Sequence, residues 1–248
     1  MCCSCDAQVC VESCGVLNNL TITGAGDQLP VSPASSAVVV SNKGCVLRSM
    51  HMRNCTVDGA WRDAAVAADG GGKLVAVNSS MHNSESSGLL VFGGHAVLHR
   101  CKADDNACRG WHVDGHGSVL LASHSCANRN KLDNANVSDG GSAHIVHCSL
   151  DGGQTNGLCV SDYYVEDRSF VTVEDCSICG NAKRSVDARF SRCKVQLRRC
   201  WFTRPKRFGA NPHSNALHFV SFLSAPPRKK RGGHTKSISD SFINPSIH

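Results

Sequence analysis

Residues 171–181, VTVEDCSICGN, decide the fold, because shorter copies of this stretch recur along the chain. In these copies the first and third residues are apolar, the fifth is polar and the sixth is most often cysteine. The copies begin at Met50, Leu74, Ala96, Val119, Ala143, Val171 and Val195, which are 24, 22, 23, 24, 28 and 24 residues apart. A repeat of this period indicates a solenoid or a propeller. One unit is too short for a propeller blade or a helix pair, so the repeat predicts a coil of short strands.

Each repeat has the pattern of two short strands that meet at an angle. Alternation of period two predicts a strand with one buried face, and the polar fifth residue suits a bend whose backbone groups need partners. The eighth residue is apolar again, so both strands face one core. A third strand is predicted before each copy, and glycines often follow it. These strands are residues 37–40, 64–67, 88–91, 110–113, 135–137, 157–160, 185–188 and 217–219.

The sixth position of the repeat gives a column of cysteines along the coil. It holds Cys55, Ser79, Cys101, His124, Cys148, Cys176 and Cys200. The column is either a row of metal ligands or a ladder of small, soft side chains that fill a corner. Rungs about 4.8 Å apart do not suit disulfide geometry, and zinc needs four convergent ligands rather than a line. The sequence therefore favours the packing ladder and predicts no metal site.

The repeat resembles that of the right-handed parallel β-helix of the pectate-lyase-like superfold. Its consensus, V-x-I-x-N-C-x-I-x-x-N, is closely matched by residues 171–181. The resemblance implies an all-β, right-handed parallel β-helix of about 7–8 turns over residues 37–220. The chain is also similar in its repeat to the intracellular β-helix domains of F-box proteins, although no F-box helices are apparent. The superfold hosts lyases, hydrolases, epimerases and binding domains, so the resemblance implies a fold rather than a chemistry.

The segments outside the repeat are expected to differ from it. Residues 1–14 form a cysteine-rich leader, residues 15–36 a partial first rung with an insertion, and residues 221–248 a disordered tail that is basic and serine-rich. Cys2, Cys3 and Cys5 could be acylated, which would tether a scaffold to a membrane, or could bind metal. A flexible leader is the preferred interpretation.

Charge and composition limit the partners. Lys and Arg number 18 against 19 acids in residues 1–202, and eight against one from residue 203 onward, so the body carries −1 and the tail +7. We therefore expect no specific nucleic-acid binding by the body. In the tail, Arg228, Lys229, Lys230 and Arg231 resemble a nuclear import signal, which would make importin a partner. No run approaches the ~20 apolar residues of a membrane span. Sixteen cysteines without a secretory signal predict reduced thiols in the cytoplasm or nucleus.

The resemblance to β-helix enzymes implies that a substrate cleft would lie on the outward face of the strand that opens each turn. That face is predicted to show Leu90, His112, Asp114, Asn136, Ser138, Cys159, Ser161, Asp187, Arg189 and His218. Asp114 and Asp187 are expected about 14 Å apart, at three rungs of ~4.8 Å, whereas a glycosidase pair spans about 5–9.5 Å. Asp139 and Asp162 are expected near the same edge, so an acidic strip along this edge remains a possible site.

A Gly-His-Gly motif lies in the turn that follows one of these strands. Residues 115–117, Gly-His-Gly, resemble an element of polygalacturonases, but Asp104 and Asp105 precede His116 by only half a turn. These two aspartates are therefore expected to form a solvated turn.

Two functions from different classes follow. The preferred one is a non-catalytic binding or scaffold module for a protein or carbohydrate, with Leu90, Phe92, Trp111, His112 and Asn136 as the binding surface. The alternative is a polysaccharide lyase or glycoside hydrolase, with Asp114, His112, Asp187 and Arg189 as catalytic candidates. No cofactor is predicted, and calcium would be needed only by a lyase.

Overall fold

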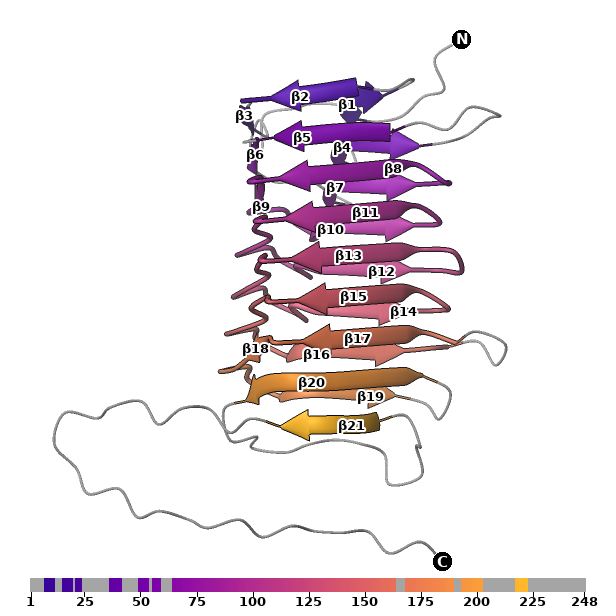
Figure 1. The fold of residues 1–248 in the computed structure, drawn as a ribbon. Coiled ribbons are helices and arrows are strands. Elements are labelled where there is room, and N and C mark those ends of the chain that lie inside the picture. The colour runs from indigo at the N-terminus through magenta and orange to yellow at the C-terminus, as the bar shows by residue number, and fades with distance from the viewer. Residues whose placement is uncertain are drawn as a thin grey trace, which may run out of the picture.

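The strands of this chain stack in parallel into one long coil (Figure 1). The computed structural model describes residues 7–11, 15–19, 21–23, 36–41, 49–53, 55–58, 64–163, 168–189, 193–202 and 217–222, and every element in these ranges is a strand. The predicted all-β parallel solenoid is therefore confirmed. Among these residues, no helix is long and apolar enough to cross a membrane.

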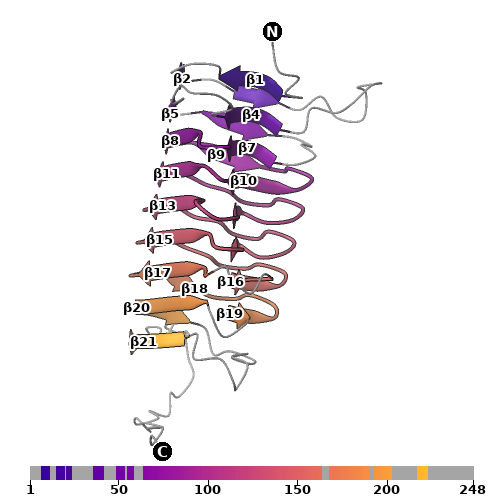
Figure 2. The same cartoon turned by 90° about the vertical axis from the view of Figure 1, so that its right-hand side faces the viewer.

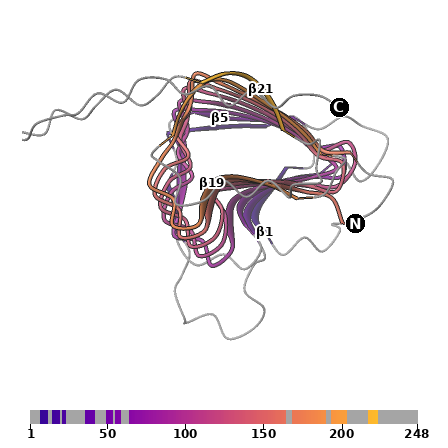
Figure 3. The same ribbon diagram turned by 90° about the horizontal axis from the view of Figure 1, so that it is seen from below.

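Three sheets form the sides of the coil, as the view along its axis shows (Figure 3). Sheet 1 contains β1 (Ala7–Val11), β4 (Ser36–Ser41), β7 (Ala64–Asp69), β10 (Ser87–Phe92), β12 (Trp111–Asp114), β14 (Ala135–Ser138), β16 (Asn156–Ser161) and β19 (Arg184–Arg189). Sheet 2 contains β2 (Gly15–Asn18), β5 (Ser49–Arg53), β8 (Lys73–Val77), β11 (His95–His99), β13 (Val119–Ser123), β15 (Ser142–Val146), β17 (Phe170–Glu174), β20 (Lys194–Phe202) and β21 (Leu217–Phe222).

Sheet 3 is the narrowest of the three. It begins with β3 (Thr21–Thr23), β6 (Thr56–Asp58) and β9 (Ser80–His82). It continues through single parallel bridges at Lys102, Cys126 and Ser149 to β18 (Ser177–Ile178), which pairs with the end of β20. Figure 2 shows the rungs of sheets 1 and 2 in side view, each above the next.

The register of the strands confirms the repeat at most of its copies and corrects it at one. Ala96 pairs with Leu120, not with Val119, so the copy predicted to begin at Val119 begins one residue later. Leu120 is fully buried, whereas Leu121 is 44% exposed. Because side chains alternate between faces, a slip of one residue reverses inside and outside. The sixth position of this repeat is therefore Ser125 rather than His124.

The interior is a continuous column of small and medium apolar side chains. In β8, β11 and β17 exposed or half-buried residues alternate with buried ones, as the sequence pattern predicts. Each buried Val, Leu or Ile contributes about 1.5–3 kcal/mol relative to leaving it exposed. The stacked rungs thus share a core that no single repeat could bury alone.

The bend between sheets 2 and 3 is made by residues with left-handed backbone conformation. The corner residues Asn78, Arg100, His124, His147, Asp175 and Arg199 have φ angles between 47° and 54°. Few non-glycine residues adopt this region. Here the corner amides from Asn78 to Asp175 bond to the next rung, as Arg100 N does to Ser123 O (3.1 Å) and His147 N to Glu174 O (3.0 Å). The stack therefore holds the conformation, and the polar bend predicted for this position is confirmed.

The residue after each corner points inward and is small. Cys101 N donates to Ser125 Oγ (3.0 Å), Ser125 N to Cys148 Sγ (3.4 Å), and Cys148 N to Cys176 Sγ (3.2 Å). These side chains are all buried and thus line the inner side of the corner.

A ladder of asparagine side chains runs through the loops that follow sheet 3. Asn106 N donates to Asn130 Oδ1 (2.9 Å), and Asn130 N donates to Asn134 Oδ1 (3.2 Å). Asn134 Nδ2 then donates to Asn181 Oδ1 (3.0 Å). On the rung between, the ladder position is Gly153, where an added Cβ would lie 3.0 Å from both Asn134 Nδ2 and Asn181 Oδ1. The carboxamide of Asn134 therefore occupies the place of the missing side chain.

The ends of the coil depart from the predicted boundaries. β1 lies within residues 1–14 and pairs with β4, so part of the expected leader is a strand of sheet 1. β21 includes His218, and it pairs with β20 in sheet 2 rather than joining sheet 1. The placement of His218 on the outward face of sheet 1 is therefore wrong. Cys2, Cys3, Cys5 and residues 223–248, with the basic run, lie outside the described residues.

Candidate functional site

The outward face of sheet 1 is formed by two columns of residues in register from rung to rung. Apart from His218, the residues predicted for this face lie on it. One column is Ala67, Leu90, His112, Asn136, Cys159 and Asp187. The other is Asp69, Phe92, Asp114, Ser138, Ser161 and Arg189.

The apolar part of this face centres on Phe92. Its side chain is 53% exposed, and Leu90 beside it is half-buried. The Phe92 ring borders the next turn, because a Cβ added to Gly115 would lie 3.4 Å from Phe92 Cε2. Trp111 does not contribute, since it is fully buried and belongs to the core. Its assignment to the binding surface was wrong, because Trp111 and His112 are adjacent in β12 and must face opposite sides.

A polar floor lies beside this aromatic ring. Asn136 and Ser138 are buried although both belong to the outward columns. The Ser138 hydroxyl donates to Asp114 Oδ1 at 2.8 Å and lies 3.4 Å from Asn136 Oδ1. Buried polar groups of this kind are held in fixed orientations by their partners.

His112 is the titratable group at the centre of the face. Burial lowers its pKa to about 4, and the positive charge of Arg109 acts in the same direction, while Asp114 and Asp133 oppose the shift. The imidazole is therefore neutral at pH 7, with one ring nitrogen as a donor and the other as an acceptor. It can take part in hydrogen bonds to an uncharged ligand.

The two carboxylates proposed for catalysis are separated. Asp114 belongs to β12 and Asp187 to β19, and β14 and β16 lie between them in sheet 1. Three rungs correspond to about 14 Å, which exceeds the spacing of a glycosidase pair. Asp187 is 1% exposed and accepts a bond of 2.5 Å from Arg184 Nη1. Arg189 lies opposite Ser161 in the sheet.

The other two aspartates near this edge hold turns together. Asp139 Oδ1 accepts the Tyr163 amide at 2.7 Å. The buried Asp162 carboxylate accepts the Ser169 amide at 3.0 Å and the Ser169 hydroxyl at 2.5 Å, as well as the Gly140 amide at 3.3 Å. The acidic strip that the sequence left open is thus a set of separate structural contacts.

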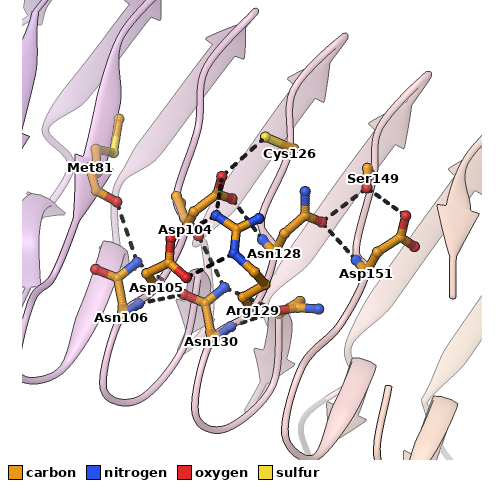
Figure 4. Close-up of polar contacts among 12 residues, drawn as sticks. Met81, Asp104, Asp105, Asn106, Cys126, Asn128, Arg129, Asn130, Ser149 and Asp151 are labelled. Carbon is orange, nitrogen blue, oxygen red and sulfur yellow. Dashed lines mark hydrogen bonds and ion pairs between the residues drawn. The ribbon is translucent and has the colours of Figure 1, made fainter. Parts of the chain in front are cut away.

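A second row of carboxylates and amides lies on the loops after sheet 3 (Figure 4). Asp104 Oδ1 accepts the Asn128 amide at 2.8 Å, and Asn128 Oδ1 accepts the Asp151 amide at 2.7 Å. Arg129 pairs with Asp105 through two bonds of 2.9 and 2.7 Å. Asp104 is buried, so the solvated turn expected for Asp104 and Asp105 applies only to Asp105. Sequence reasoning missed this row, although its members recur at the ninth position of successive repeats.

Two of the corner cysteines, Cys101 and Cys200, are protonated packing groups. Burial raises the pKa of the Cys101 and Cys200 thiols, so both stay protonated near neutrality. Within the described residues, no three His, Cys, Asp or Glu side chains converge as a metal site would require. The corner cysteines Cys55, Cys101, Cys148, Cys176 and Cys200 are in the thiol form, without disulfides.

Comparison with known proteins gives one match. Residues 36–219, about three quarters of the chain, match the family described as a right handed beta helix region. No curated protein and no solved structure matches the chain. The match is to a structural repeat, and it covers the coil from β4 to β20 and the first half of β21.

Proposed function

The chain belongs to the right-handed β-helix family, and from this premise we propose that it is a non-catalytic binding module. The family contains both pectate-lyase-like enzymes and binding modules, so the choice between them depends on this chain's own residues. We propose that the outward face of sheet 1 around Phe92 binds a carbohydrate.

The choice of a binding module over an enzyme rests on the separation and the pairing of the carboxylates. Asp114 and Asp187 stand about three rungs apart, Asp187 is paired with Arg184, and Asp139 and Asp162 hold turns. A glycosidase or lyase needs acidic or basic groups that converge on one bond. The dispersed arrangement supports binding over bond cleavage.

The composition of the face supports a carbohydrate ligand. Phe92 offers a flat apolar ring at the surface, and the half-buried His112 and Asp114 offer hydrogen-bonding groups beside it, with Asn136 buried beneath them. Binding sites that combine an apolar surface with a few placed polar groups suit ligands that have both kinds of surface. A sugar ring has an apolar C–H face and a rim of hydroxyls. The neutral state of His112 favours an uncharged ligand.

The test is a panel of neutral and acidic oligosaccharides, measured for binding by calorimetry and for cleavage by mass spectrometry. We expect binding without cleavage, and a loss of affinity of about tenfold or more in Phe92→Ala. The matched control is Phe170→Ala, because Phe170 is also exposed (40%) but lies on sheet 2. Equal losses in the two variants would contradict the assigned face. Cleavage that Asp114→Asn or Asp187→Asn abolishes would establish the enzyme alternative instead.

We also propose, from the sequence of the tail, that the basic run directs nuclear import. Arg228, Lys229, Lys230 and Arg231 form a compact charge cluster that follows two prolines. A fluorescent fusion in which these four residues are alanine should be lost from the nucleus. An unchanged distribution would remove the proposal, leaving a cytoplasmic location as the expectation.

A further inference from the structure

A groove lies along the corner between sheets 2 and 3, on residues separate from the outward face of sheet 1. It has a volume of about 480 Å³, within the range of ligand sites in proteins. Arg100, Lys102, His124 and His147 line it, with Asp175 and Trp201 toward its other end. We call it the corner groove.

Two columns of residues form its walls. Arg100, His124 and His147 are corner residues with φ angles of 54°, 50° and 53°. Across the groove, a line of parallel bridges runs from Lys102 to Trp201. The inward-pointing residues Cys101, Ser125 and Cys148 separate the walls. Because these side chains face the core, those on either side of them diverge toward solvent.

The positive charges of the corner groove are not neutralised by neighbouring acids. Arg100 and Lys102 are exposed, and the described residues provide neither side chain with an ion pair. Two other exposed arginines of the coil are paired, Arg129 with Asp105 at 2.7 Å and Arg199 with Asp175 at 2.7 Å. The acid in the groove, Asp175, is thus already engaged by Arg199.

The imidazoles add hydrogen-bonding capacity between these charges and the aromatic end. The His124 and His147 rings are stacked, with centroids 4.9 Å apart and an angle of 20° between planes. His99 meets His124 edge-on at 5.5 Å. Among the described residues, the ring nitrogens of His124 and His147 have no hydrogen-bond partner in the protein. Their outer edges are free to bind a ligand.

The two ends of the groove therefore differ in chemistry, with cations at one end and an aromatic ring at the other. Arg100 and Lys102 share one rung, and Trp201 lies four bridges further along sheet 3, which corresponds to about 19 Å at ~4.8 Å per rung. Trp201 is half-buried and offers a flat apolar surface. A ligand that fills the groove would be elongated, with its negative charge at the Arg100 end and a ring at the Trp201 end.

We propose that the corner groove binds an elongated small ligand that carries a carboxylate, sulfate or phosphate group at one end and a ring at the other. The guanidinium of Arg100 and the ammonium of Lys102 bind the oxyanion. The imidazole edges of His124 and His147 bind the middle of the ligand, and the indole of Trp201 stacks on the ring. The site is independent of the proposed function of sheet 1.

The test uses four probes in calorimetric titrations of the full chain: trigalacturonate, a sulfated tetrasaccharide, ATP and neutral maltotetraose. Trigalacturonate, the tetrasaccharide and ATP supply carboxylate, sulfate and phosphate respectively, so the ranking identifies the source of the anion. We expect at least one of these three to bind more tightly than 1 mM, and affinity to fall as salt is raised. Maltotetraose should not compete for this site.

The key variant is Arg100→Asn combined with Lys102→Gln. Asparagine suits the left-handed corner, as Asn78 occupies the same column with a φ of 47°, so the backbone is preserved. We expect affinity for the anionic probe to fall at least tenfold. The matched control, Lys73→Gln with Lys131→Gln, removes two exposed charges outside the groove and should change affinity less than twofold.

Three results would overturn the proposal. The first is no binding of any anionic probe. The second is binding that survives Arg100→Asn/Lys102→Gln in a folded variant, and the third is an equal loss in the Lys73/Lys131 control, which would indicate non-specific attraction. Trp201→Ala tests the orientation with inorganic phosphate as a fifth probe. The variant should weaken binding of the anionic probes, which all carry rings, and leave binding of inorganic phosphate unaffected. A failure here leaves the Phe92 test unchanged, because the two sites share no residue.

Discussion

Replacing Asn134 by glycine should break the asparagine ladder at the rung where it is most unusual. Asn134 is fully buried, accepts from Asn130 N at 3.2 Å and Asn130 Nδ2 at 3.0 Å, and donates to Asn181 Oδ1 at 3.0 Å. Three hydrogen bonds at ~1 kcal/mol each, with about 0.5–1 kcal/mol for the added backbone freedom, give a loss of about 3–4 kcal/mol in the free energy of unfolding.

The same geometry predicts a rescue. Gly153→Asn alone should destabilise the protein, because its Cβ would lie 3.0 Å from Asn134 Nδ2 and its carboxamide would compete for the same space. In the double variant Asn134→Gly/Gly153→Asn, the carboxamide of the new asparagine at position 153 would take the place of the Asn134 carboxamide between Asn130 and Asn181. The two changes should therefore be coupled by about 2 kcal/mol or more in the stabilising direction.

Urea unfolding of the wild type, both single variants and the double variant, followed by circular dichroism, measures this coupling. Asn78→Gly serves as the control. Asn78 is exposed at a corner with a φ of 47°, where glycine is tolerated, so its unfolding free energy should change by less than about 1 kcal/mol. Additive single effects, or an Asn134→Gly variant within 1 kcal/mol of wild type, would refute the argument that one carboxamide serves two rungs.

Three further outcomes follow from the described contacts. Gly157→Ala should prevent folding, because the new Cβ would lie 2.2 Å from a buried isoleucine side chain. The control Gly117→Ala, at φ +81° with no atom within 4 Å of the new Cβ, should lower the free energy of unfolding by only about 1 kcal/mol. Soluble expression and thermal melting distinguish the two variants. Burial, reinforced by the charge of Asp104, raises the pKa of Cys126 to about 12, so iodoacetamide at about pH 8 should label it slowly and Asp104→Asn should speed labelling in peptide mass maps. The pKa of His112, lowered to about 4, lies below about 6.5 in the unfolded chain, so the unfolded state binds more protons in this window. Stability should fall on the order of 1–3 kcal/mol as pH drops from about 6.5 to about 4, and a pH slope that His112→Gln leaves unchanged would contradict the assignment.

The fold could be predicted because the repeat imposes two periods at once. Alternation within a strand fixes which side chains face the core, and recurrence at about 24 residues places equivalent side chains in adjacent rungs. The prediction failed where several apolar residues are adjacent. At residues 119–121 the alternation fits either parity, and only the pairing of Ala96 with Leu120 decides it. His218 was misplaced for a related reason, since a short apolar strand near the end of the repeat suits sheet 1 or sheet 2 equally.

The candidate site was only partly accessible from the sequence. The outward columns of sheet 1 follow from alternation, but burial does not: Asn136 and Asp187 are outward-facing and yet buried. Trp111 was assigned by its residue type, although its position beside His112 in one strand places it inside. The role of Asn134 could not have been inferred, because its side chain fills a vacancy on a different rung.

The corner column shows why such a repeat conveys the fold more readily than the function. The corner residues share one backbone conformation, and the amides of those from Asn78 to Asp175 bond to the next rung in one pattern. These residues are Asn78, Arg100, His124, His147, Asp175 and Arg199. Because backbone hydrogen bonds hold the corner, its side chains are free to vary. Along the axis the column changes from an amide to a cation, then to imidazoles and then to an ion pair. A consensus sequence of the repeat does not retain these differences between rungs. Specificity in this coil should therefore be sought where successive rungs differ at one position. Arg100, which has no ion pair within the described part of the chain and precedes two stacked histidines in the column, is such a place.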